Sequence, residues 1–127
     1  MRKQLTPLFV LCVLTVSACQ SKKSPCDDKL LVLEGDGPIQ VESQWVACVA
    51  RNASKLASNQ MDNNRLAALA VELCAANAKR YSKALTDTTP LLSEKQVSRL
   101  VEYKQESLTK IAISELQRAR QLGCEAK

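Results

Sequence analysis

Apolar residues recur at helical spacing along the chain from residue 39 onward, and the alternation typical of β-strands is scarce. Three segments carry the helical pattern, at about 39–58, 64–86 and 93–122. Their apolar stripes consist of Val41, Trp45, Cys48, Val49, Ala53 and Leu56; of Leu66, Ala70, Leu73, Cys74, Ala78, Tyr81 and Leu85; and of Val97, Leu100, Val101, Leu108, Ile111, Ala112, Leu116 and Ala119. The sequence therefore predicts an all-α fold, a small bundle of three main helices.

Local signals mark the ends of these segments. The break at 35–38 precedes the first, and the polar run 59–64 provides a turn between the first and the second. Ser93 followed by Gln96 fits a capping box at the start of the third. Gly123 is a natural residue for a left-handed helix stop. The third helix is thus the best delimited of the three.

Residues 26–38 have no clear periodicity. The apolar run Leu30 to Leu33 has the composition of a short strand, but the rest of the chain offers no partner strand. We expect an extended arm or one short helix, held to the bundle through Cys26.

The first residues follow the order of an export signal. Arg2 and Lys3 precede an apolar run from Leu8 to Val16, and small residues follow. A membrane-spanning helix needs roughly 20 apolar residues, whereas this stretch is interrupted by polar residues and ends at Gln20. A buried core helix at the extreme amino end, with cationic residues before it and polar residues after it, fits the order poorly.

The sequence Val16-Ser17-Ala18-Cys19 resembles the lipobox of bacterial lipoproteins. The resemblance implies cleavage between Ala18 and Cys19 and acylation of Cys19 on its thiol and on the new amino group. It divides the chain into a signal peptide (1–18), a lipidated cysteine with its tether (19–25) and a single helical domain (26–127). Gln20 replaces the aspartate that marks inner-membrane retention in enteric members. The resemblance thus implies an outer-membrane protein facing the periplasm, with the inner membrane and the cell surface as alternatives.

Four of the six cysteines remain once Cys12 leaves with the signal peptide and Cys19 carries lipid. An even number of cysteines in an oxidising compartment indicates two disulfides, with three possible pairings. Cys48 lies thirteen residues before Met61 and Cys74 thirteen residues after it. An antiparallel hairpin that turns near Met61 brings both cysteines to the same level, about 20 Å from the turn. We therefore expect a Cys48–Cys74 disulfide, which leaves Cys26 for Cys124.

The composition argues against several other functions. The chain has no histidine, and its cysteines lack the close pairs of a zinc site or of a Cys-x-x-Cys redox motif. The formal charge of +5 falls by two when Arg2 and Lys3 leave with the signal peptide. This mild charge and the predicted export speak against nucleic acid as a partner. No metal and no cofactor are expected beyond the covalent lipid on Cys19.

No catalytic constellation stands out either. The neighbours Ser82 and Lys83, and likewise Ser107 and Lys110, read as ordinary surface residues rather than as Ser-Lys dyads. A loose acidic cluster lacks the spacing of a calcium-binding EF-hand loop and fits a solvated loop; its members are Asp27, Asp28, Glu34 and Asp36. We expect no enzymatic activity and no small-molecule substrate.

Two features are candidates for a partner surface. Trp45 would be a natural binding hot spot if it were exposed, although a lone tryptophan on an apolar stripe is more often a core residue. Lys79, Arg80 and Lys83 form the densest basic group after the signal peptide. Such a group is usually a solvated helix face, and its functional alternative is contact with anionic lipid or with an acidic partner.

Taken together, these features predict a lipid-anchored periplasmic factor that binds another protein and acts in assembly, as a pilot, or as an inhibitor. Helical pilot lipoproteins of secretion and pilus complexes are similar in size and anchoring. An immunity or exclusion lipoprotein, directed against a toxin or a conjugating cell, is one alternative. An unrecognised envelope enzyme is an alternative of a different class.

Overall fold

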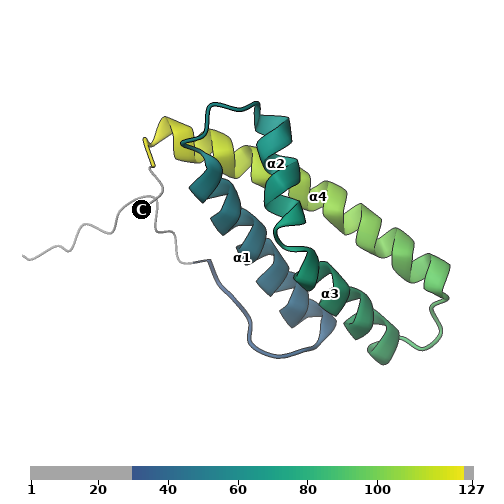
Figure 1. Ribbon diagram of the computed structural model, residues 1–127. Coiled ribbons are helices and arrows are strands. Elements are labelled where there is room, and N and C mark those ends of the chain that lie inside the picture. Colours follow the sequence, from purple (N-terminus) through teal and green to yellow (C-terminus); the bar gives the residue numbers. More distant parts are fainter. Residues whose placement is uncertain (1–29, 125–127) are drawn as a thin grey trace, which may run out of the picture.

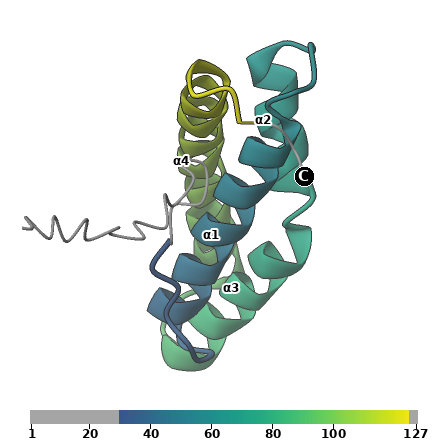
Figure 2. The ribbon, with the colours of Figure 1, turned by 90° about the vertical axis from the view of Figure 1, so that its left-hand side faces the viewer.

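The computed structural model describes residues 30–124, which contain four helices and no strand. They are α1 (Pro38–Leu56), α2 (Asn63–Glu72), α3 (Ala75–Thr88) and α4 (Glu94–Gln121). Figures 1 and 2 show α1 and α4 running in the same general direction, while α2 and α3, which follow α1 in the chain, run the opposite way. The prediction of an all-α bundle is confirmed.

α1 begins where the sequence break ends. Pro38 occupies the first helical turn, where its missing N–H costs no intrahelical hydrogen bond. The helix buries Val41, Trp45, Val49 and Ala53, four members of the predicted stripe, and ends within two residues of the predicted boundary. The spacing of these residues places them on one face of the helix, toward the rest of the bundle.

The expected middle helix at 64–86 is wrong in one respect, because the structure divides it into α2 and α3. The backbone departs from helical geometry at Cys74, which follows the last residue in helical conformation, Leu73, although the segment contains no glycine or proline there. The physical reason lies in packing: α2 packs chiefly against α4, whereas α3 packs chiefly against α1. A bend allows one segment to follow two differently directed neighbours, and local sequence does not encode it.

Both ends of α4 agree with the sequence signals. Ser93 accepts a hydrogen bond from the Gln96 backbone N–H, and the Gln96 side chain accepts one from the Ser93 N–H, which completes the capping box. At the far end Gly123 has φ of 65°, and the Cys124 N–H bonds to the Ala119 carbonyl. The expected limits of 93–122 are therefore confirmed to within one residue.

The core is built from small and branched residues around one aromatic pair. Trp45 and Tyr81 lie with ring centroids 5.7 Å apart, and Leu66, Leu108 and Leu116 are fully buried beside alanines of all four helices. The many alanines let the helices approach closely. No buried residue of the described chain is polar or charged by residue type.

A disulfide joins Cys48 of α1 to Cys74 at the bend between α2 and α3, with the Cα atoms 6.1 Å apart. This confirms the pairing predicted from the hairpin register. The Asn52 amide donates to the sulfur of Cys74 at 3.3 Å and to the Cys48 carbonyl. Of the second expected pair, Cys26 lies outside the described residues, so the Cys26–Cys124 disulfide stays a prediction.

Residues 30–37 form an extended arm that runs back along α1 (Figure 1). The Ser43 hydroxyl donates to the Leu31 carbonyl and accepts from the Leu33 N–H, at 3.0 and 3.1 Å. The Gln44 amide donates to the carbonyls of Leu33 and Gly35. Gly35 has φ of 118°, a conformation that favours glycine, and it turns the arm toward α1. The first of the two sequence expectations, an extended arm, is therefore confirmed for residues 30–37.

Candidate interaction surface

The predicted cleavage site between Ala18 and Cys19, and the predicted lipidation site Cys19, lie outside the described part of the chain. The same holds for Asp27 and Asp28 of the acidic cluster. The structure describes the surface of the helical domain that this anchor would hold at the membrane.

Trp45 does not belong to that surface. Its side chain is fully buried, and it packs against Tyr81 in the centre of the core. Its indole Nε1 is buried without a hydrogen-bond partner among the described residues. The expectation that Trp45 could anchor a partner is therefore corrected: its helical spacing turns it inward, and it acts as a core residue.

The three basic residues all lie exposed on the outer side of α3, but they are not equally available. Arg80 donates to Asp36 of the arm at 2.7 Å and to the Gln44 side chain at 2.7 Å. Lys83 pairs with Asp87 at 2.5 Å, one turn further along the helix. This hydrogen bond, together with the carboxylate charge, raises the pKa of the Lys83 ammonium. Lys79 makes no ion pair with another residue in 30–124 and is the most accessible charge of the group.

Two leucines on the outer side of α2 precede this basic group. Leu73, at the bend, is 57% exposed, and Leu69 lies exposed one turn before it. The sequence pattern had placed Leu73 in the buried stripe, which is wrong, because Leu73 lies on the same exposed side as Leu69, one helical turn before it. Leu69 is an apolar residue that lies outside the predicted buried stripe. Its position off the stripe is the sequence signal that could have identified it as an exposed leucine. We call Leu69, Leu73, Lys79 and Lys83 the outer face.

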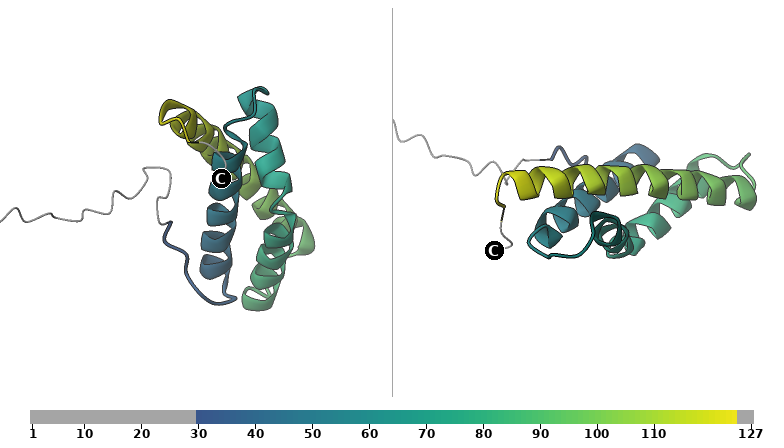
Figure 3. Two further views of the ribbon diagram at one scale, coloured as in Figure 1. Left: turned by 60° about the vertical axis from the view of Figure 1, so that its left-hand side comes forward. Right: turned by 90° about the horizontal axis from the view of Figure 1, so that it is seen from above.

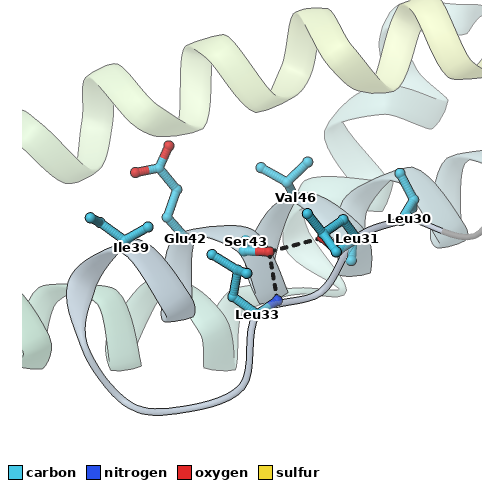
Figure 4. A pocket seen from close by; sticks show the side chains of 8 residues that line it. Leu30, Leu31, Leu33, Ile39, Glu42, Ser43 and Val46 are labelled. Atoms are coloured by element: carbon cyan, nitrogen blue, oxygen red, sulfur yellow. Dashed lines mark hydrogen bonds between the residues drawn. The ribbon is translucent and has the colours of Figure 1, made fainter.

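A second apolar region lies between the arm and α1 (Figure 4). It is a shallow hollow of about 280 Å³. Its lining consists of Leu30, Leu31, Leu33, Ile39, Glu42, Ser43, Val46 and Ala47. In Figure 4 the side chains of Ile39, Glu42 and Val46 rise from α1 toward α4, and those of the arm close the near side. Sequence reasoning missed this hollow because it depends on how the arm lies against α1.

The electrostatics of the hollow are set by one ion pair. Glu42 on its floor binds the ammonium of Lys104, the residue that interrupts the apolar stripe of α4. Both side chains are half-buried, so each charge is compensated where water is scarce. Nearby, burial raises the pKa of the Tyr81 phenol, the Glu42 carboxylate raises it further, and Lys104 opposes the shift.

Members of the two Ser-Lys pairs, Ser82 with Lys83 and Ser107 with Lys110, are bonded to other groups in the structure. Lys83 is engaged with Asp87, and the Ser107 hydroxyl donates to the Tyr103 carbonyl of its own helix. Within residues 30–124 no three histidine, cysteine or acidic side chains gather as a metal site requires. No helix of that range is long and apolar enough to span a bilayer.

Comparison of the chain with protein-family models, with curated protein sequences and with solved structures finds no match.

Proposed function

We propose that this protein is a lipid-anchored periplasmic factor of the bacterial outer membrane that binds another protein, in an assembly, pilot or inhibitor role. The lipobox-like sequence ending at Cys19 supports the anchor and the location. The same proposal includes cleavage after Ala18 and a second disulfide, Cys26–Cys124, which would close the domain near its tether.

The observation that carries the binding role is the outer face of α2 and α3. Leu69 and Leu73 expose aliphatic surface one to three turns before Lys79, whose ammonium makes no ion pair within residues 30–124, and the disulfide at Cys74 fixes this stretch to α1. Apolar side chains next to a charge on a rigid element suit recognition, because little conformational entropy is lost on binding. The partner that fits is a protein with an apolar patch bordered by acidic residues.

The anchor is tested by growing cells with a palmitate analogue and measuring the intact mass of the purified protein. We expect label on the wild type and none on Cys19→Ser, which should accumulate as an uncleaved precursor. Normal processing of Cys19→Ser would contradict lipid attachment at that residue.

The binding role is tested by placing a photo-crosslinking amino acid at position 73 and irradiating intact cells. We expect a discrete protein adduct that is reduced at least several-fold by Lys79→Glu. The matched control is Lys95→Glu, which makes the same charge change on an exposed residue of α4 and should leave the adduct unchanged. An adduct insensitive to Lys79→Glu, or none at all, would contradict recognition by the outer face.

A further inference from the structure

A second apolar surface lies around the arm and the start of α1, and it has no role in the proposed function. On the arm Leu31 is 83% exposed, and at the start of α1 Ile39 is 70% exposed. Tyr103 of α4 is 68% exposed and precedes Lys104, whose ammonium binds Glu42, one of the residues that line the hollow. We call Leu31, Leu33, Ile39 and Tyr103 the arm face.

The neighbouring side of α4 extends this surface. Leu100 lies one turn before Lys104 and Ile111 two turns after it, so helical geometry places both on the same side of the helix as Lys104. Both leave more than a third of their surface in water. Because Lys104 binds Glu42, which lines the hollow, this side of α4 borders the arm face.

We propose that the arm face rests on the lipid bilayer that holds the protein, an inference that depends on the proposed lipid anchor. Only ten residues separate Cys19 from Leu30. A segment of that length reaches at most about 36 Å even when fully extended. The arm is therefore the described segment nearest along the chain to the acyl groups, and its leucines are presented to the headgroup region at high effective concentration.

Several polar groups of this surface are bonded within the protein, which lowers the cost of moving them out of water. The carbonyls of Leu31, Leu33 and Gly35 accept from the side chains of Ser43 and Gln44. Asp36 is paired with Arg80, and Glu42 with Lys104. Tyr103 adds an aromatic ring with a polar tip, the kind of side chain that is enriched at the membrane–water interface.

This orientation leaves the outer face available for a protein. In both views of Figure 3 the arm lies on one side of the bundle and α2 on the other. A domain that contacts lipid through the arm face thus directs α2 away from the membrane. A protein partner is the alternative occupant of the arm face, but the short distance along the chain between Cys19 and the arm favours the bilayer.

The test uses the mature protein, reconstituted into vesicles of phosphatidylethanolamine and phosphatidylglycerol after its mass has shown the lipid on Cys19. Ile39→Trp reports on the arm face, and Leu73→Trp is the matched control on the outer face. Both positions are exposed, so neither substitution disturbs the core. The wild type supplies the baseline emission of buried Trp45.

We expect brominated lipids to quench most of the additional emission of Ile39→Trp and to leave that of Leu73→Trp unchanged. Tyr103→Trp gives a second probe of the same face and should be quenched as well. Equal, weak quenching at positions 39, 103 and 73 would overturn this inference while leaving the lipid anchor intact. A protein whose Cys19 carries no lipid would overturn the proposed anchor and this inference together.

Discussion

Arg120, near the end of α4, donates from its guanidinium to the carbonyl oxygen of Ala57 at 3.1 Å, where the chain leaves α1. The same side chain donates to the carbonyls of Asn59 and Met61 and binds the Asn63 side chain. One cation thereby holds the connection between α1 and α2. The guanidinium N–H groups thereby satisfy carbonyl oxygens that have no intrahelical partner at a helix end.

We expect Arg120→Ala to lower the free energy of unfolding by about 1.5–3 kcal/mol, the range for hydrogen bonds to a charged group. Arg120→Lys should recover only part of that loss, because an ammonium cannot reproduce the planar fork. Urea denaturation of the mature protein provides the measurement. Arg99→Ala, an exposed arginine of the same helix, is the control and should stay within about 0.5 kcal/mol of the wild type. An equal effect of both substitutions would show that α4 loses helix stability generally and would contradict the role of the loop contacts.

The disulfide gives a second prediction. Replacing Cys48 and Cys74 together by alanine should cost about 3–4 kcal/mol on the chain-entropy estimate for the loop they close. The measurement is again urea denaturation, with Asn52→Ala as the control. That variant removes the amide that contacts Cys74 but keeps the covalent link, so it should cost far less. A double alanine variant as stable as the wild type would contradict a stabilising role for this disulfide.

The same variant tests the origin of the bend between α2 and α3. Because the two helices pack against different neighbours, we expect the bend at Leu73 and Cys74 to persist without the disulfide. Backbone chemical shifts of residues 72–76 report it directly. Shifts that become continuously helical through these residues would show that the covalent link, and not packing, breaks the helix.

Where local signals exist, the fold could be predicted closely from the sequence. The capping pair Ser93 and Gln96 and the stop at Gly123 act within one turn, so a single sequence contains all the information they need. The Cys48–Cys74 pairing was accessible because hairpin register follows from counting residues along two helices. The bend at Leu73 was not accessible, because it arises from contacts with α1 and α4 that no neighbouring residue signals.

The candidate surfaces were less predictable for the same reason. The exposure of Leu73 follows from which side of α2 faces the other helices. The hollow exists because Ser43 and Gln44 bind the backbone of an arm that lies 9 to 12 residues earlier in the chain. Of the residues proposed for a partner surface, Lys79 and Lys83 lie exposed, Arg80 is tied to Asp36, and Trp45 is buried. Helical periodicity separates inner from outer positions, but it does not show which outer charges are already paired.

Trp45 is a large core residue whose indole N–H has no hydrogen-bond partner among the described residues. Substitution of Trp45 therefore has two opposite effects on the free energy of unfolding: loss of volume lowers it, and loss of the unpaired N–H raises it. Trp45→Ala should cost about 3–5 kcal/mol, because it leaves a cavity beside Tyr81. Trp45→Phe should cost only about 1 kcal/mol, since the lost volume is offset by removal of a buried N–H that has no partner. Thermal and urea unfolding of the two variants give the comparison. A phenylalanine variant as unstable as the alanine variant would indicate that the indole N–H has a stabilising role.

Tyr81 should make stability depend on pH in the alkaline range. Burial raises the pKa of its phenol above the ordinary value of 10.0, with Glu42 contributing in the same direction. Once the pH passes about 10, the unfolded chain loses this proton while the folded protein still holds it. The unfolded state then binds fewer protons than the native state, so the free energy of unfolding falls as pH rises. This contribution is fully present below the unfolded pKa and is lost as pH rises through the higher folded pKa.

The measurement is the free energy of unfolding at several values between about pH 9 and pH 11, compared between the wild type and Tyr81→Phe. Lysines titrate in the same range and affect both proteins alike, so the Tyr81 contribution is the difference between the two slopes. We expect the wild type to lose stability more steeply than Tyr81→Phe. The tyrosinate absorbance of Tyr103→Phe, which leaves Tyr81 as the only tyrosine, should independently place the phenol pKa above 10.0. Identical slopes, or ionisation at the ordinary value, would mean that the phenol reaches water freely and that the α1–α3 contact around Trp45 is looser than the structure has it.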